Sequence, residues 1–155
     1  MKRTPQYWLM KSEPSEYSID DLKRDRVAPW FGVRNYLARN YMRDQMRPGD
    51  MVLFYHSSCP EPGVTGVAKV ASTAYPDVTQ FDQKSHYYDA KATKEKPRWM
   101  LVDVRYVKCF RRVVTLPMLR HEQSLQGLII LRPGNRLSIT PVTEKEFQTV
   151  LALAT

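Results

Sequence analysis

The 155-residue sequence is poor in the residues that hold metals and disulfides, since it has two cysteines and three histidines. Cys59 and Cys109 form no Cys-x-x-Cys pair, and His56, His86 and His121 are scattered along the chain. A zinc site needs more closely spaced Cys and His ligands, and a disulfide framework needs more cysteines. We therefore expect no metal and no cofactor.

Long apolar runs are also missing. No run approaches the ~18 residues of a membrane-spanning helix. Residues 1–14 carry charge but lack the apolar segment and small-residue cleavage site of a signal peptide. We expect no membrane partner and a cytoplasmic protein, or a nuclear one if the source is eukaryotic. The length suits one domain over residues 1–155, and we expect a monomer.

Acidic residues are the minority among charged ones. The chain has 24 lysines and arginines against 16 aspartates and glutamates, a formal net charge of +8. Positive charge gathers in three tracts, at residues 34–47, 91–98 and 105–112. This excess indicates an anionic partner, and nucleic acid is the usual one.

Several short strands are predicted by apolar, aromatic and β-branched runs, at 7–11, 51–57, 64–72, 99–110 and 137–142. In the run at 99–110, Met100, Val102, Val104, Tyr106 and Phe110 are expected to share one face. Gly66, within a strand pattern, indicates a bulge or a close backbone approach.

Short helices are expected between and after these strands. One covers 18–24 with Ser18 as N-cap, one runs from Gly32 towards Pro48, one covers 115–121, and the last begins at Thr143 with a capping box completed by Glu146. Since strands and helices do not alternate regularly, a doubly wound sheet is disfavoured. We predict an α+β fold: a small mixed β-barrel with short helices packed around it.

The stretch WFGVRNYLARNYMRD at 30–44 contains Arg-Asn twice. Wound as a helix, it places Val33, Leu37 and Tyr41 on one apolar stripe, which is the expected core face. A half-buried guanidinium beside such a stripe is costly unless it is paired.

The polar residues of this helix divide into two groups. Asn35, Arg39 and Arg43 form a separate outer face, whereas Arg34 and Asn40 lie at the edge of the apolar stripe. Arg34 is either part of a structural salt bridge or a pocket wall that presents donors to a ligand.

Five short blocks occur in order: KSEP at 11–14, WFGVRNYLARN at 30–40, GDMVLFYHS at 49–57, GVTG at 63–66 and YPD at 75–77. They resemble the EVE domain, in its thymocyte nuclear protein-like and stand-alone bacterial forms, over nearly the whole chain. The resemblance implies a PUA-like pseudo-barrel related to the PUA, ASCH and YTH domains. It also implies a reader of modified bases, chiefly modified cytosines such as 5-methylcytosine in DNA.

A base reader needs an aromatic wall, polar groups matched to the base edge, and a basic rim for phosphates. The base must be flipped out of a duplex or taken from a single strand. Trp30, in a Pro-Trp-Phe-Gly turn, is expected to be an accessible stacking wall, with a core position as the alternative. Trp8 lies in a strand and is core or pocket floor. By resemblance to YTH domains, Lys11 and Ser12 lie beside the base, although Ser12 has a turn residue as its alternative role.

Strand ends converge at the mouth of a small barrel, so Tyr55, His56 and Ser57 are expected to face Trp30 and Ser12. His56 taken alone is more often a structural histidine. The full expected base pocket is Trp8, Lys11, Ser12, Trp30, Gly32, Val33, Arg34, Asn35, Tyr55, His56 and Ser57.

The basic rim is assigned to the helix of the Arg-Asn pairs. Arg39 and Arg43 are expected to contact phosphate, Arg34 to fix the pocket floor or its loops, and Asn40 to bond the neighbouring backbone.

Two other functions remain open. One is an RNA reader of a modified base, and the other is a small hydrolase acting on a modified nucleoside, with Glu13, Asp77 and Lys11 as candidates. A Cys59 nucleophile with His56 as base is disfavoured because no third orienting group is evident. We assign no catalytic residue and predict a nucleic-acid-binding module.

Overall fold

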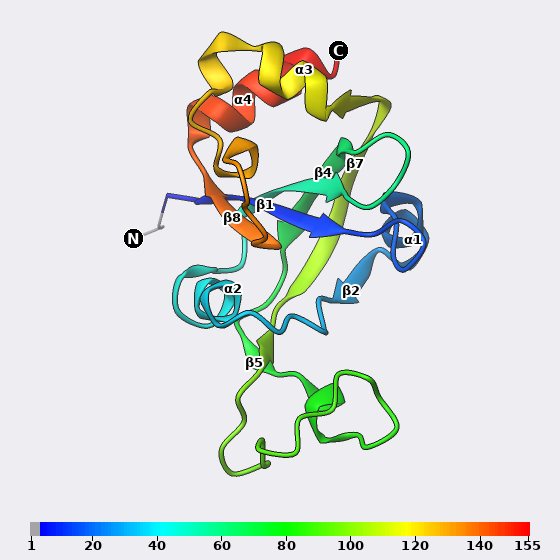
Figure 1. The fold of residues 1–155 in the computed structure, drawn as a ribbon, viewed down its shortest axis with the longest axis vertical. Coiled ribbons are helices and arrows are strands. Elements are labelled where there is room, and N and C mark those ends of the chain that lie inside the picture. The colour runs from blue at the N-terminus through cyan, green and yellow to red at the C-terminus, as the bar shows by residue number, and fades with distance from the viewer. Residues whose placement is uncertain (1–3) are drawn as a thin grey trace.

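The computed structural model describes residues 4–155. Figure 1 shows a strongly curved sheet, with α3 and α4 at one end and a long looped extension beyond β5 at the other. The sheet has six strands in the order β2-β7-β4-β3-β1-β8. This arrangement, with its few short helices, confirms the predicted α+β fold.

The sheet strands have the following bounds: β1 Tyr7–Ser12, β2 Val27–Pro29, β3 Met51–His56, β4 Gly63–Val70, β7 Asp103–Thr115 and β8 Ile139–Val142. β1 and β3 are parallel, and the other pairs are antiparallel. A parallel pair needs a long crossover, and residues 13–50 supply it. A separate ribbon pairs β5 (Tyr75–Pro76) with β6 (Met100–Leu101).

The α-helices occupy the crossover and the C-terminal third. Their bounds are α1 Ile19–Asp25, α2 Tyr36–Asn40, α3 Leu116–His121 and α4 Glu144–Leu153, with a π-helical turn η1 at Tyr41–Gln45 and 3₁₀ turns η2 Val78–Phe81, η3 Gln123–Leu125 and η4 Ile129–Leu131. Ser18 and Thr143 form the capping boxes of α1 and α4. Both predicted helix starts are therefore confirmed. Within residues 4–155, no helix combines the length and apolarity required to cross a bilayer.

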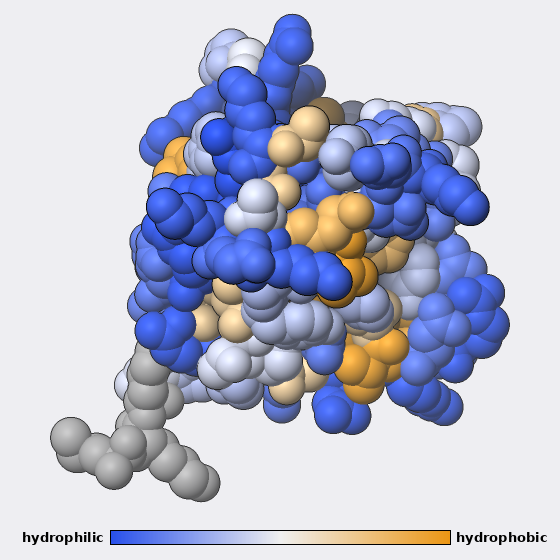
Figure 2. All heavy atoms as spheres, turned by 90° about the horizontal axis from the view of Figure 1, so that it is seen from below, coloured by the Kyte–Doolittle hydropathy of each residue, from blue (hydrophilic) through white to orange (hydrophobic). Residues whose placement is uncertain are grey.

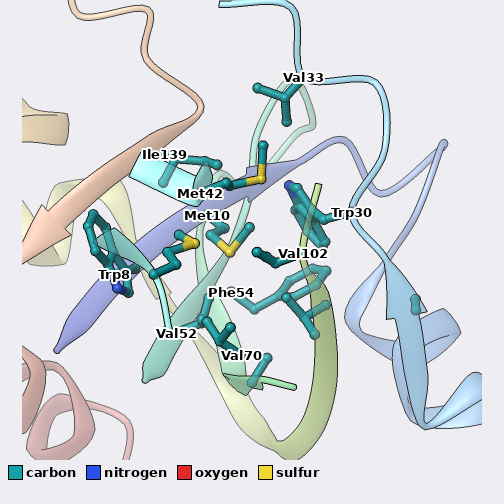
Figure 3. Packing of buried hydrophobic residues seen from close by; sticks show 14 of the residues in the cluster. Trp8, Met10, Trp30, Val33, Met42, Val52, Phe54, Val70, Val102 and Ile139 are labelled. Carbon is teal, nitrogen blue, oxygen red and sulfur yellow. The ribbon is translucent and has the colours of Figure 1, made fainter. Parts of the chain in front are cut away.

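The core lies on both faces of the sheet because the strand pleat sends alternate residues to opposite sides. Trp8 and Met10 belong to one buried cluster, together with Phe54 (Figure 3). Leu9 and Tyr55 belong to the other, against which α3 and α4 contribute Leu119 and Phe147. We call these the inner and the outer cluster.

Gly66 confirms the expected close approach. The register between β4 and β7 shifts beside it, and a Cβ at this position would lie 2.3 Å from the carbonyl oxygen of Lys108. A side chain would therefore push β7 away from β4.

The apolar stripe predicted for the helix after Gly32 is partly wrong: Val33 is buried and Tyr41 packs against the inner cluster, but Leu37 is not in the core. The helix begins at Tyr36, and Leu37 is 46% exposed, whereas Ala38 and Met42 are fully buried. Because the chain enters the helix three residues later than expected and then widens into η1, a different face meets the core.

The predicted single face of the strand at 99–110 is partly wrong. Val102 and Val104 pack in the inner cluster, but Phe110 packs in the outer one. The two register irregularities between β4 and β7 interrupt the alternation on which the prediction rested.

Asp50 fastens β1 to the turn before β3. Its carboxylate is fully buried and accepts hydrogen bonds from the backbone N–H groups of Gln6 (3.0 Å) and Arg47 (3.1 Å) and from Nε1 of Trp8 (3.1 Å). Replacing it leaves three donors without this acceptor.

We therefore expect Asp50→Ala to lower the free energy of unfolding by about 3 kcal/mol, since each buried unsatisfied donor costs ~1–3 kcal/mol. Urea denaturation followed by tryptophan fluorescence measures this. The control is Glu61→Ala, an exposed acidic position, which should change stability by less than about 0.5 kcal/mol. Equal effects in the two variants would show that Asp50 does not fasten the sheet.

Candidate functional site

A cavity of about 470 Å³ opens beside the C-terminal end of β1. One side comes from β1 and the start of the crossover, a second from residues 27–34, and a third from Tyr87 in the loop after η2. We call it the first cavity. The residues that matter to its chemistry are Lys11, Ser12, Glu13, Trp30, Phe31, Gly32, Val33, Arg34 and Tyr87.

The end of β1 is held in place by backbone and hydroxyl hydrogen bonds. Oγ of Ser12 donates to the carbonyl oxygen of Tyr17 (2.6 Å), and the carbonyl oxygen of Ser12 accepts from the N–H of Ser57 (3.0 Å). Ser12 thus stabilises the turn that follows β1 and also lines the cavity. Burial lowers the pKa of the neighbouring Lys11 ammonium.

Trp30 is not the accessible ring that the sequence suggested. It is 9% exposed and packs edge-on against Phe54, with ring centroids 5.5 Å apart (Figure 3). It directly follows β2, and its backbone N–H donates to the carbonyl oxygen of Val102 (2.9 Å). This bond continues the pairing with β7 and turns the indole towards the inner cluster, so that the ring borders the cavity from within.

Three aromatic residues that the sequence analysis missed line the first cavity: Tyr17, Phe31 and Tyr87. Phe31 is 52% exposed, and its ring meets that of Tyr87 at 5.9 Å and 72°. Phe31 lies in the same turn as Trp30. The sequence indicated an accessible aromatic ring in this turn, but the prediction assigned that role to Trp30. Tyr87 lies in an irregular loop and had no periodic signal at all.

Gly32 is required between these rings. Its φ is +85°, a value that favours glycine, and a Cβ would lie 2.7 Å from the Tyr87 ring. Its N–H donates to Oδ2 of Asp77 at 2.7 Å. The glycine therefore lets the turn approach both the tyrosine and the buried carboxylate.

Arg34 resolves the alternatives in favour of a structural salt bridge. Its Nη1 lies 3.2 Å from Oδ2 of Asp77, a carboxylate that is fully buried. Its Nη2 donates to Oγ1 of Thr79 (3.0 Å), and Nε and Nη2 donate to the carbonyl oxygen of Tyr87 (3.1 and 2.8 Å). As expected, Arg34 fixes loops around the cavity, here the segment 77–87.

Asp77 has no oxygen left for proton transfer. Besides Gly32 and Arg34, its carboxylate accepts from the backbone N–H (2.9 Å) and the hydroxyl of Thr79. Of the three groups named for a hydrolase, Lys11 and Glu13 line the first cavity, and Asp77 is scaffold.

Of the residues predicted for the outer face, Asn35 is exposed, as expected, whereas Arg39 is half-buried. Asn35 is the N-cap, whose Oδ1 accepts from the N–H of Ala38 (3.0 Å), and it does not line the cavity. Arg39 turns inward: its Nη1 donates to the carbonyl oxygen of Arg98 (2.8 Å). Asn40 was expected to bond the backbone, but its Oδ1 accepts from Nε and Nη2 of Arg39 (3.1 and 2.8 Å).

Arg43 is exposed, as expected, and its Nε lies 2.8 Å from Oδ1 of Asp44. Tyr36 stacks on Trp99 at 4.8 Å and lies beneath the guanidinium of Arg39. Figure 2 views the molecule from below Figure 1 and shows hydrophobic patches separated by hydrophilic atoms.

Trp8 is core and not pocket floor. It is 1% exposed, bonds Asp50 and lies 5.3 Å from the ring of Tyr41, away from the first cavity. Val33 is also buried, but it does line that cavity.

Contrary to the prediction, Tyr55, His56 and Ser57 do not face Trp30. Tyr55 and Ser57 line a second cavity of about 560 Å³. Tyr55 pairs with Lys11 across β1 and β3, and the pleat directs it to the outer cluster, whereas Trp30 is in the inner one. The strand ends thus meet two cavities instead of one.

His56 is a structural histidine, as its ordinary role suggested. Its Nε2 accepts from the N–H of Ile19 (3.1 Å), and its ring packs edge-on against Phe54. Burial lowers its pKa, opposed in part by Asp20 and Asp21.

Cys59 and Cys109 are both free thiols. Throughout residues 4–155, the His, Cys, Asp and Glu side chains form no group of three that could hold a metal ion.

Comparison with known proteins gives one consistent family. The EVE domain model matches residues 6–153. Chicken thymocyte nuclear protein 1 is 42% identical over 165 residues, covering 95% of this chain and 68% of the relative.

Solved structures agree. A Pseudomonas syringae protein is 51% identical with a TM-score of 0.93, covering 96% of this chain and 99% of that one. Human THYN1 protein in complex with 5-methylcytosine containing DNA is 39% identical with a TM-score of 0.89, covering 96% and 97%.

Asp77→Asn should loosen the wall of the first cavity, because it leaves the Arg34 charge without its counter-ion. Arg34 keeps 23% exposure, so we expect a loss of about 2–3 kcal/mol, at or below the low end of the range for a broken buried pair. Trypsin cleavage after Lys91 or Lys94 should become faster. The control is Asp82→Asn, at an exposed position of the same loop. Its free energy of unfolding and its rate of trypsin cleavage should equal those of the wild-type protein.

Thermal stability should fall as the pH is lowered from about 7.5 to 5.5. The pKa of His56 is depressed in the folded state from its ordinary 6.5. The unfolded chain therefore binds the proton more strongly, and stability present above that value is lost as the pH falls through the folded pKa. Melting curves of His56→Gln should show a smaller loss. His121→Gln, an exposed control, should keep the full loss, and an undiminished loss in His56→Gln would contradict the assignment.

Proposed function

Since the chain belongs to the EVE domain family, we propose that it is a nucleic-acid-binding module that reads a modified base. Modified cytosine in DNA is the favoured ligand, and the base enters the first cavity after flipping from the duplex or from a single strand. RNA is the competing substrate. The human relative bound to 5-methylcytosine DNA, 39% identical over nearly the whole chain, supports this choice.

The observation that carries the proposal is the lining of the first cavity. Trp30 forms its inner wall, and the rings of Phe31 and Tyr87 meet edge to face beside Gly32. Aromatic faces stack on a base in a way that tolerates different sequences, at about 1–3 kcal/mol per base. Ser12 and Lys11 supply a hydroxyl and an ammonium for the polar edge of the base.

Discrimination would come from apolar contact with the added group. Val27, Ala28 and Val33 line the same cavity. Burying one methyl group contributes roughly 0.8 kcal/mol, or about fourfold in affinity. A modest preference for the modified base is therefore expected.

Of the two arginines expected to contact phosphate, only Arg43, in η1, keeps that role on this proposal. Its guanidinium is exposed, and its pair with Asp44 lies at the surface, where an ion pair contributes little and can be exchanged for a phosphate. The side chain of Arg39 acts instead through Arg98 and Tyr36, which it holds in place.

Phe31→Ala tests the site with little risk to the fold, since the ring is half exposed. Affinity for an oligonucleotide with one 5-methylcytosine should fall by about 1–3 kcal/mol, and the preference over plain cytosine should shrink. Fluorescence anisotropy with matched duplex and single-stranded DNA and RNA measures both quantities. Tyr88→Ala is the control, an aromatic of similar exposure that does not line the first cavity.

A 2-aminopurine placed beside the target cytosine should brighten on binding, because flipping unstacks it. Equal affinity for modified and plain cytosine in the wild-type protein would overturn base reading. Tighter binding of the RNA strand would replace DNA by RNA as substrate.

A further inference from the structure

The second cavity shares only Lys11 with the proposed base site. It lies where β1 and β3 end, and it is closed by α3 and by the turn at residues 132–135. Its volume of about 560 Å³ exceeds that of the first cavity. Lys11 lines both, so the two cavities meet at this residue.

The lining of the second cavity is positive and uncompensated. Lys11, Arg120 and Arg132 all border it, and no Asp or Glu is among the described residues that do so. Within the described chain, none of the three forms an ion pair, whereas Arg34 beside the first cavity is paired with Asp77. Like charges gathered at one concave surface raise its affinity for an anion.

Asn135 adds a donor that lacks an acceptor. Its Oδ1 accepts from the N–H of Leu137 (3.2 Å), which fixes the orientation of the amide. The Nδ2 is then buried, with no hydrogen-bond partner in the described chain. A buried N–H group calls for an acceptor, and the oxygens of a phosphate are acceptors of the right charge for this cavity.

We propose that the second cavity is a phosphate-binding site and that it takes a backbone phosphate of the strand whose base occupies the first cavity. The second part rests on the proposed function. The cavity is large enough for a sugar–phosphate unit, and the shared Lys11 gives one strand a continuous path from one cavity to the other. Arg120 and Arg132 provide the charge, and Asn135 provides a directed hydrogen bond.

The test measures the salt dependence of binding to a single-stranded DNA oligonucleotide that carries one 5-methylcytosine. Arg120→Ala and Arg132→Ala should each reduce the slope of log affinity against log salt by about 0.7–1. Asn135→Ala should weaken binding about tenfold at unchanged slope, because the lost bond is to a charged group but the side chain is neutral. The control is Arg111→Ala, an exposed arginine of equal charge that borders neither cavity, which should keep the wild-type slope.

A methylphosphonate scan identifies the phosphate. Replacing one phosphate near the modified base by the neutral analogue should weaken binding by the wild-type protein, and should weaken binding by Arg132→Ala less, because one of the cations that bind this phosphate is already missing. Equal losses in both proteins at every position, or unchanged slopes in both arginine variants, would overturn the proposal. Competition by inorganic phosphate or a nucleoside monophosphate, with no effect of the methylphosphonates, would overturn the strand assignment and leave a small-molecule phosphate site.

The outcome is separable from that of base reading. The ratio of affinities for modified and plain cytosine reports on the first cavity and should be the same in Arg132→Ala as in the wild-type protein. Suppose that the wild-type protein binds modified and plain cytosine equally, while the arginine variants still show reduced salt slopes. Base reading would then be rejected, and the phosphate site would be retained.

Discussion

The ion pair between Arg34 and Asp77 is the interaction on which the first cavity depends. It joins segments 43 residues apart, and the carboxylate is fully buried. Removing either partner would strand a charge in a low-dielectric environment. The Arg34 guanidinium also donates to the carbonyl oxygen of Tyr87, and the Asp77 carboxylate also accepts from the N–H of Gly32. The aromatic wall therefore stands where it does because one buried pair fixes both of its ends.

The sheet pleat is the second constraint, since it decides which side chains meet. Lys11 and Tyr55 are register partners at the end of the parallel pair, and Tyr55 points to the outer cluster. A strand end can therefore contribute to two surfaces at once. This division separates the aromatic first cavity from the cationic second one, although both begin at the same residue.

The sequence was informative wherever local chemistry decides the structure. The capping boxes at Ser18 and Thr143, the close approach at Gly66 and the mixed fold follow from residue types at fixed spacing. The failures at Trp30 and Tyr87 share a cause: they depended on long-range contacts. Trp30 is buried because β2 pairs with β7, a pairing between short segments that no periodicity announced. Tyr87 is held at the site by two hydrogen bonds from Arg34, a residue 53 positions away.

The same distinction applies to charge. The basic tract at residues 34–47 was the expected phosphate surface. In the folded chain, however, Arg34 forms an ion pair with Asp77, and Arg39 donates to a backbone carbonyl. A half-buried cation that is satisfied within the protein gains little from a phosphate, because its hydrogen bonds must first be given up. The cations free to attract a strand are those that are unpaired or, like Arg43, paired only at the exposed surface, and position in the sequence does not reveal which they are. In this fold Lys11, Arg120 and Arg132 come from three distant elements and converge on one cavity. The net charge of +8 thus predicts an anionic partner, but the pairing of each cation in the folded chain decides where that partner is held.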